Sequence, residues 1–229
     1  MKKNLTRPFL ALTIVGGLLP LAAQAQLRIT EVSSTGSGNS TYQHDWFELR
    51  NDGPLSLDIT GWRVDDDSAL FSSALTLRGV TSIAPGQVVI FMESNTSGTS
   101  DAANGAAFES AWFGSNIPAG FTLGFYGGSG IGLSSTSDAV NIYDSTGVLQ
   151  AGVTFGLATT GVSFDNAAGL SGEISLLSAV GVNGAFNSVT GSEIGSPGIA
   201  PVPEPSVIAL AGLGLVSLLG LRRLKNRQA

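Results

Sequence analysis

The last twenty-nine residues set the strongest limit on what this 229-residue chain can fold into. Residues 206–221 are sixteen uncharged, mainly apolar residues. As a helix with a rise of about 1.5 Å per residue they would extend about 24 Å, slightly less than the roughly 30 Å hydrocarbon core of a bilayer. They predict a single transmembrane helix, so any soluble domain must be built from the residues before it.

A basic cluster directly after this apolar run predicts its orientation. The cluster consists of Arg222, Arg223, Lys225 and Arg227. Long basic side chains can reach from a short helix to the membrane surface, and basic clusters stay on the cytoplasmic side. We therefore interpret the cluster as a membrane stop-transfer signal and expect an N-outside, C-inside topology.

Residues 1–25 have the three parts of a secretory signal peptide. The positively charged first part contains Lys2, Lys3 and Arg7. An apolar core at 9–21 precedes a small-residue cleavage site formed by Ala23 and Ala25. We expect the mature chain to begin at Gln26, with an uncleaved N-terminal anchor as the alternative.

The composition of the chain favours a β-rich domain between these two ends. Only 12% of the residues are charged, whereas an ordinary soluble domain has about 25%. The 31 glycines, together with abundant Ser, Thr and Val, favour strands and turns over helices. About 175 residues suffice for one hydrophobic core but not for two comfortable domains. Because the chain has no cysteine, this core must form without disulfides.

The charge of the segment from Gln26 to Ala200 is strongly negative. Four arginines stand against sixteen Asp and Glu residues, a formal charge of −12. Because proteins bind phosphate backbones by neutralising them with cations, we expect no nucleic-acid partner. The acidity favours solubility through self-repulsion, and attraction of divalent cations is the alternative.

Alternating apolar and polar residues predict a series of short strands. They lie at 27–32, 46–50, 88–92, 121–126, 138–143 and 148–155, with weaker ones at 162–164 and 173–177. In the last long strand, Leu149, Ala151, Val153 and Phe155 are expected on one side. Many short strands at close spacing are typical of a β-sandwich.

Three further local patterns lead to specific expectations. In the second strand, Phe47 and Leu49 share one face, and Glu48 and Arg50 lie on the other, where they could pair across strands. At Gly61 the apolar positions that are expected to face inward change from odd-numbered to even-numbered residues, which predicts a β-bulge. The apolar run at 88–92 predicts a strand that is buried on both faces.

The segment 94–120 consists mostly of small residues and is long for a loop in a compact domain. Asp101 could cap a short helix through 102–112, on which Phe108 and Trp112 would share one face. We expect a helical excursion packed by Trp112. A partly disordered insertion is the alternative.

Several motifs resemble the lamin tail domain, an immunoglobulin-like sandwich. They are Ile29–Val32, Asp45–Asn51, Leu57–Trp62, Ile83–Gly86, Asp138–Val140 before Tyr143–Gly147, and the closing turn Ser196–Gly198. The resemblance implies an all-β, immunoglobulin-like domain over residues 26–156, and it supplies no catalytic residues. Residues 157–200 are expected to add a further β segment and a Gly/Ser-rich linker.

The start of the C-terminal segment 201–229 carries a second resemblance. Val202, Pro203, Glu204 and Pro205, followed by one helix and a basic end, resemble the PEP-CTERM sorting signal of Gram-negative, biofilm-forming bacteria. That resemblance implies cleavage by an exosortase and export to the surface or matrix. The prolines keep the motif extended and free of helix, so a protease can reach its backbone. A plain type I membrane anchor is the alternative.

Two sets of residues are candidates for chemistry. His44 is the only histidine and stands beside Asp45, but no Gly-x-Ser-x-Gly motif supports a serine hydrolase. Asp65, Asp66 and Asp67 are adjacent carboxylates, and calcium prefers such oxygen ligands. A solvated turn is the alternative interpretation of these aspartates, which lack the spacing of an EF-hand loop.

These observations lead to one functional expectation. We expect a non-catalytic, exported surface or matrix protein, without a required cofactor, whose partners are the secretion machinery, an exosortase and, transiently, the membrane. Its β-domain would bind an extracellular polysaccharide or protein. The alternatives are a secreted hydrolase with an unrecognised site and a calcium-dependent adhesin.

Overall fold

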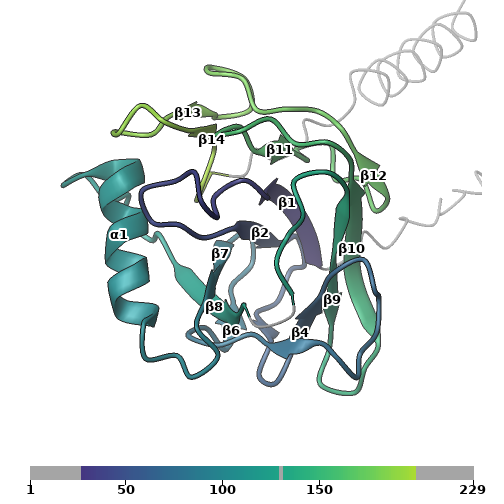
Figure 1. Ribbon diagram of the computed structural model, residues 1–229. Helices are drawn as coiled ribbons and strands as arrows, with labels where there is room; N and C mark the ends of the chain where they lie inside the picture. The colour runs from purple at the N-terminus through teal and green to yellow at the C-terminus, as the bar shows by residue number, and fades with distance from the viewer. Residues whose placement is uncertain (1–26, 129–130, 200–229) are drawn as a thin grey trace, which may run out of the picture.

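The computed structural model describes residues 27–128 and 131–199 (Figure 1). The expected signal peptide, the sorting motif, the transmembrane helix at 206–221 and the basic cluster therefore lie outside the described residues. Within the described part, no helix combines the length and apolar character that a membrane span requires.

Two five-stranded sheets pack against each other to form the domain (Figure 1). The first sheet has the order β11 (Phe164–Asp165), β1 (Leu27–Ser33), β2 (Trp46–Asn51), β7 (Val88–Ser94) and β8 (Leu123–Gly127). The second has the order β12 (Glu173–Ile174), β10 (Leu149–Phe155), β9 (Asp138–Tyr143), β4 (Arg63–Asp65) and β5 (Leu75–Thr76). Two small ribbons pair β3 (Leu57–Asp58) with β6 (Ser82–Ile83) and β13 (Phe186–Asn187) with β14 (Ile194–Gly195).

The strand patterns place one hydrophobic core between the sheets. Phe47 and Leu49 of β2 face this core, as their shared parity predicts, and meet Val140 and Ile142 of β9 there. Trp46 lies on the opposite face of β2 and is also fully buried. The first sheet is therefore covered on both faces, and the prediction that the strand at 88–92 is buried on both sides is confirmed.

The expected helix is present as α1 (Asp101–Phe113), and it covers the outer face of the first sheet. It connects β7 to β8, which pair in parallel. Phe108 and Trp112 are buried as expected, and their rings pack at 5.9 Å and 6.0 Å from the ring of Trp46. The expected cap is wrong, because Ser100 is the N-cap residue and Asp101 is the first helical residue.

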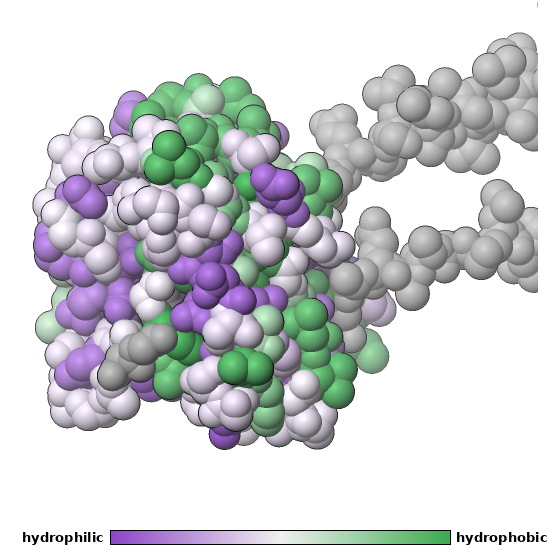
Figure 2. Space-filling view, turned by 45° about the vertical axis from the view of Figure 1, so that its right-hand side comes forward, coloured by the Kyte–Doolittle hydropathy of each residue, from purple (hydrophilic) through white to green (hydrophobic). Residues whose placement is uncertain are grey.

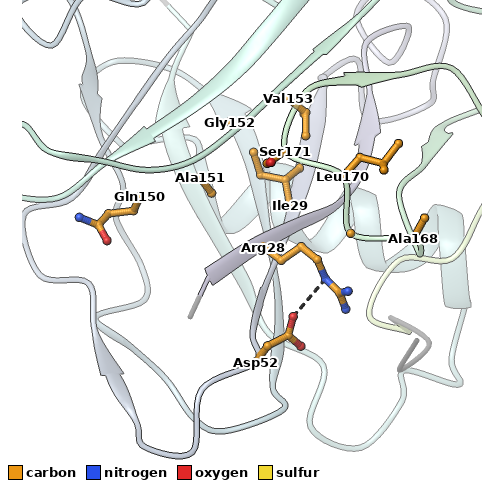
Figure 3. Close-up of a pocket in the computed structure, with 11 residues that line it drawn as sticks. Arg28, Ile29, Asp52, Gln150, Ala151, Gly152, Val153, Ala168, Leu170 and Ser171 are labelled. Atoms are coloured by element: carbon orange, nitrogen blue, oxygen red, sulfur yellow. Dashed lines mark ion pairs between the residues drawn. The ribbon is translucent and has the colours of Figure 1, made fainter. Parts of the chain in front are cut away.

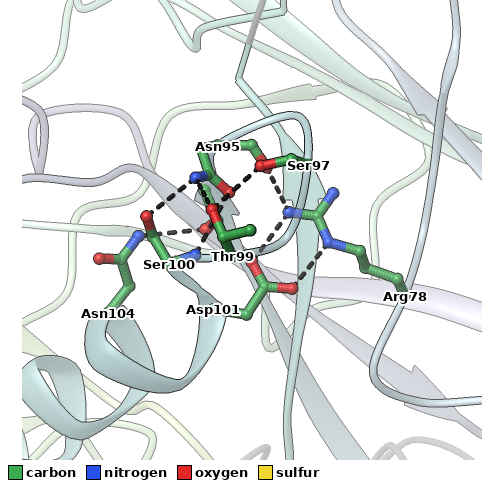
Figure 4. Close-up of polar contacts among 8 residues, drawn as sticks. Arg78, Asn95, Ser97, Thr99, Ser100, Asp101 and Asn104 are labelled. Atoms are coloured by element: carbon green, nitrogen blue, oxygen red, sulfur yellow. Dashed lines mark hydrogen bonds and ion pairs between the residues drawn. The ribbon is translucent and has the colours of Figure 1, made fainter.

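Asp101 instead forms a bidentate ion pair with Arg78 (Figure 4). Its carboxylate accepts hydrogen bonds from Nε at 2.7 Å and from Nη2 at 2.9 Å, and Nη2 also donates to the carbonyl of Asn95 at 2.6 Å. The Asn95 side chain donates to the hydroxyls of Thr99 and Ser100. The arginine thus ties the loop before α1 to the start of the helix, and it lowers the pKa of Asp101.

We expect this ion pair to stabilise the docking of α1 measurably. In a double-mutant cycle with Arg78→Gln and Asp101→Asn, the coupling energy should be about 1 kcal/mol, because the pair is bidentate and partly buried. Urea unfolding of the four proteins would measure it. Arg63→Gln, which alters an arginine stacked on Phe71, should show no coupling with Asp101→Asn. A coupling near zero for Arg78 would contradict this role.

The switch of inward-facing positions at Gly61 is caused by a turn and not by the predicted bulge. Gly61 adopts φ +75°, and the amide of Trp62 donates to the carbonyl of Ile59 at 3.0 Å, so residues 59–62 form a turn. This turn carries the chain from the β3–β6 ribbon into the second sheet. The prediction of a bulge was wrong because the strands on either side belong to different sheets.

A real irregularity in β10 overturns a second expectation. The register between β9 and β10 shifts between Leu149 and Ala151. Leu149 is therefore 52% exposed, whereas Val153 and Phe155 are buried in the core. The prediction that Leu149 shares their side of the strand was wrong.

Residues 157–199 pack into the same structure. β11 extends the first sheet beside β1, and β12 extends the second sheet beside β10. The β13–β14 ribbon lies over the outer face near α1, where the ring of Phe186 packs 5.6 Å from that of Trp112. The last described residues thus return to the first sheet. Figure 2 shows one face of the domain, on which hydrophilic and hydrophobic residues are intermixed.

Candidate functional site

A groove runs along β10 where this strand has an open edge. On one side β10 pairs with β9 over its length, but on the other side it pairs with β12 only at Thr154 and Phe155. Among the residues that the structure describes, the edge from Leu149 to Val153 therefore has no strand partner. A pocket of about 230 Å³ lies beside it (Figure 3). Its lining residues are Arg28, Ile29, Asp52, Gln150–Val153 and Ala168–Ser171.

A second pocket continues the first along the same strand. It measures about 310 Å³ and shares Gln150–Val153 and Ser171 with its neighbour. Asn141, Leu149, Thr154 and Gly172 complete its lining. We refer to the two pockets together as the β10 groove. Its outer wall is the loop that leads from β11 to β12.

This outer wall is held to β1 by Asn166. The Asn166 amide nitrogen donates to the carbonyl of Ile29 at 2.7 Å and to that of Leu170 at 3.0 Å. Its amide oxygen accepts the backbone N–H of Leu170 at 2.9 Å. The wall is therefore an ordered loop that is fastened to the first sheet.

Arg28 supplies the charge of the groove. Its side chain is only 10% exposed, and Nε lies 3.2 Å from the Asp52 carboxylate, as Figure 3 shows. Gly169 makes room for it, because a methyl group at that position would lie 2.6 Å from Nη1. The Nη2 atom is buried and has no hydrogen-bond partner among the described residues. Burial lowers the pKa of Arg28, but an arginine stays charged near neutral pH.

The predicted aspartates do not converge on one point. Asp65 is fully buried, and its carboxylate accepts bonds from the Ser68 hydroxyl and the Leu70 amide, both at 2.6 Å, and from the Ser73 hydroxyl at 3.1 Å. Asp66 accepts the amide of Ser68, and Asp67 is exposed. Within the described residues, no group of three His, Cys, Asp or Glu side chains could hold a metal ion. Asp65 therefore organises its own loop.

His44 and Asp45 also take part in separate local contacts. His44 is half-buried and hydrogen-bonded to the Asn104 side chain of α1, and burial lowers its pKa. Asp45 is buried and accepts the backbone N–H of Ser37 at 3.0 Å, and burial raises its pKa. The carboxylate next to His44 in sequence thus serves to hold the preceding loop.

A buried pair of glutamates, which the sequence did not reveal, lies on the outer face of the first sheet. Glu31 of β1 and Glu48 of β2 are opposite each other in the register, and both are fully buried. Glu31 accepts the Ser196 amide at 2.8 Å, the Ser196 hydroxyl at 3.0 Å and the Ser163 hydroxyl. Glu48 accepts the Thr30 hydroxyl at 2.5 Å and the Gly198 amide at 2.7 Å.

The two glutamates therefore clamp the closing segment 195–199 to the sheet. Burial raises the pKa of Glu31 to about 7, and burial together with the charge of Glu31 raises that of Glu48. Glu48 and Arg50 were expected to pair across strands. Glu48 does so by accepting the Thr30 hydroxyl of β1, whereas Arg50 forms an ion pair with Asp52, two residues further along the chain, at 2.9 Å. The available signal was a glutamate beside apolar residues of a strand: Val32 follows Glu31, and Phe47 and Leu49 flank Glu48.

Taken with the sequence of the C-terminal end, the two-sheet fold defines an immunoglobulin-like β-domain that precedes a sorting signal. The Lamin Tail Domain model matches residues 20–157, and the PEP-CTERM protein-sorting motif matches residues 201–224. Because the first match covers more than half of the chain, the chain belongs to the lamin tail domain family. Both resemblances noted in the sequence are confirmed. No curated protein matches the chain.

The sorting motif establishes the general destination of the chain. Proteins that carry it are exported, sorted to the cell surface and processed by an exosortase. The described domain is thus the part that is delivered.

Proposed function

We propose that this chain is a non-catalytic protein of the bacterial cell surface or biofilm matrix, in which the lamin tail domain is a binding and structural module. The observation that carries this proposal is the β10 groove. It combines an open strand edge with a buried arginine on a domain that a sorting signal delivers to the outside. Pockets that converge on a few polar groups are the usual places for ligands.

The buried acidic side chains support a structural role for the remainder of the domain. Asp45 and Asp65 hold loops, and Glu31 and Glu48 hold the closing segment, all through hydrogen bonds from the chain itself. Buried acidic groups whose partners come from the chain itself are typical of a structural role. We accordingly expect no hydrolase activity that depends on His44, and assays of His44→Ala with generic ester, peptide and glycoside substrates would test this.

We expect the Pro-Glu-Pro motif to control processing of the tail. Replacing Pro203, Glu204 and Pro205 by alanine should leave the tail uncleaved and the protein in the inner membrane. Cell fractionation with mass spectrometry of both mature ends would measure this. The wild-type protein should begin at Gln26 and lack the basic cluster.

Pro201→Ala provides a matched control, because it removes a neighbouring proline outside the motif. This variant should be processed like the wild type. An intact basic tail on wild-type protein at the cell surface would instead identify a plain type I membrane anchor, and the sorting part of the proposal would fail.

A further inference from the structure

We propose that the β10 groove binds an acidic polypeptide segment, which adds to the open edge of β10 as an extended strand and places a carboxylate beside Arg28. This inference rests on the proposed role of the domain as a binding module and names the class of its partner. It identifies the partner by chemistry, namely a peptide strand with alternating apolar and acidic side chains.

The open edge supplies the backbone part of this recognition. A strand without a neighbour presents unpaired N–H and C=O groups, which an added peptide can satisfy. The free edge from Leu149 to Val153 is five residues long, about 17 Å at roughly 3.3 Å per residue. Both pockets of the groove lie along this same stretch, so space and backbone hydrogen-bonding groups coincide.

Arg28 supplies the charge part of the recognition. A guanidinium and a carboxylate form strong, charge-assisted hydrogen bonds. The Nη2 atom of Arg28 has no acceptor within the described part of the chain, and Asp52 is shared with Arg50. The single negative charge of Asp52 is therefore divided between two guanidinium groups. On a segment with a formal charge of −12, an acidic ligand is attracted here and repelled by most of the remaining surface.

The side chains along the groove favour a peptide over a polysaccharide. None of the described lining residues is aromatic, although sugars bind well on flat aromatic faces. Instead, Leu149 and Leu170 border the groove and are 52% and 51% exposed. They offer contacts for apolar side chains that alternate with the acidic one along a strand.

A displayed library of random nonapeptides, selected on the full chain in a mild nonionic detergent, tests the proposal. We expect enrichment of sequences with an Asp or Glu at a fixed distance from alternating apolar residues. The best peptide is then synthesised with three changes made separately: its acidic residue replaced by the amide, alternate backbone amides N-methylated, and its order scrambled. Fluorescence anisotropy measures the dissociation constants.

Two groove variants and one control accompany the peptides. Arg28→Gln should weaken the best peptide at least tenfold and abolish its preference over the amide version. Ser171→Trp fills the groove from an exposed position without changing Arg28 and should abolish binding even if Arg28→Gln does not fold. Arg63→Gln removes an arginine elsewhere, over Phe71, and should bind like the wild type.

Each remaining outcome overturns the proposal. If selection on the wild type enriches no peptides relative to selection on Ser171→Trp, the groove binds no peptide. If the N-methylated peptide binds as tightly as the unmodified peptide, strand addition is excluded. Arg28-dependent binding of polygalacturonate that displaces the peptide would assign the groove to an acidic polysaccharide. Self-association that Ser171→Trp abolishes would assign it to a second copy of this chain. None of these results affects the sorting experiment, so the proposed function and this inference fail separately.

Discussion

The free energy of unfolding should fall by on the order of 3 kcal/mol between about pH 4.5 and pH 7, mainly because of Glu31. Its pKa is raised from an ordinary value of 4.5 to about 7 by complete burial. Over this interval the unfolded chain loses the proton while the folded chain retains it. Stability is therefore fully present below about pH 4.5 and is lost as the pH rises through about 7, at about 1.36 kcal/mol per unit.

Other buried carboxyl groups act in the same direction. Burial raises the pKa values of four further carboxyl groups outside the Glu31–Glu48 pair, which belong to Asp45, Glu93, Asp138 and Glu193. Asp101 has a lowered pKa and contributes in the opposite sense, but only at more acidic pH. The domain should accordingly be more stable at pH 5 than at pH 8, whereas many proteins are most stable between these values.

Glu31→Gln tests the assignment of this pH dependence. The glutamine amide has the same shape as the protonated carboxyl group but does not ionise. The free energy of unfolding of the variant should therefore depend much less on pH. The variant also removes the negative charge that raises the pKa of Glu48. Urea unfolding at pH 5, 6, 7 and 8 would measure it on the full chain in detergent. Glu173→Gln, at an exposed position, should keep the wild-type slope. Equal slopes for the wild type and Glu31→Gln would refute the role of Glu31.

Alternation along the sequence predicted the strands well because burial on a sheet is a local, periodic property. The parity of Phe47 and Leu49 and the bounds of β9 follow from the side chains themselves. Helix α1 was predictable for the same reason, since Phe108 and Trp112 are one turn apart. What periodicity could not supply was the partner of each buried polar group.

The contacts that were missed join distant parts of the chain. Ser196 is 165 residues from Glu31, and nothing near either residue indicates the other. Arg28 and Gln150 meet in one pocket only because β1 and β10 are each the second strand of a different sheet, next to the short edge strands β11 and β12. The candidate site could therefore not be found from the sequence. The family and the sorting signal could be recognised, because their motifs consist of residues that are adjacent in the chain.

Gly195→Ala should destabilise the domain by about 2 kcal/mol, because the closing segment leaves no space for a side chain there. A methyl group at this position would lie 2.6 Å from Oε1 of Glu31, 2.9 Å from the Ser163 hydroxyl and 3.1 Å from the Trp112 ring. Glu31 cannot move aside without breaking its bonds to Ser163 and Ser196. Trp112 is a rigid ring packed against Trp46, so it too has little freedom to move.

Gly156→Ala is the matched control for this steric effect. A methyl group at residue 156 meets no atom within 4 Å, and neither glycine requires a positive φ. The control should be neutral or slightly stabilising, because alanine restricts the unfolded chain. Urea unfolding at pH 5 would compare the two, and hydrogen exchange should show faster exchange of the Ser196 and Gly198 amides in Gly195→Ala only. If both variants unfold alike, the clamp between Glu31 and the closing segment does not contribute to stability as its geometry indicates.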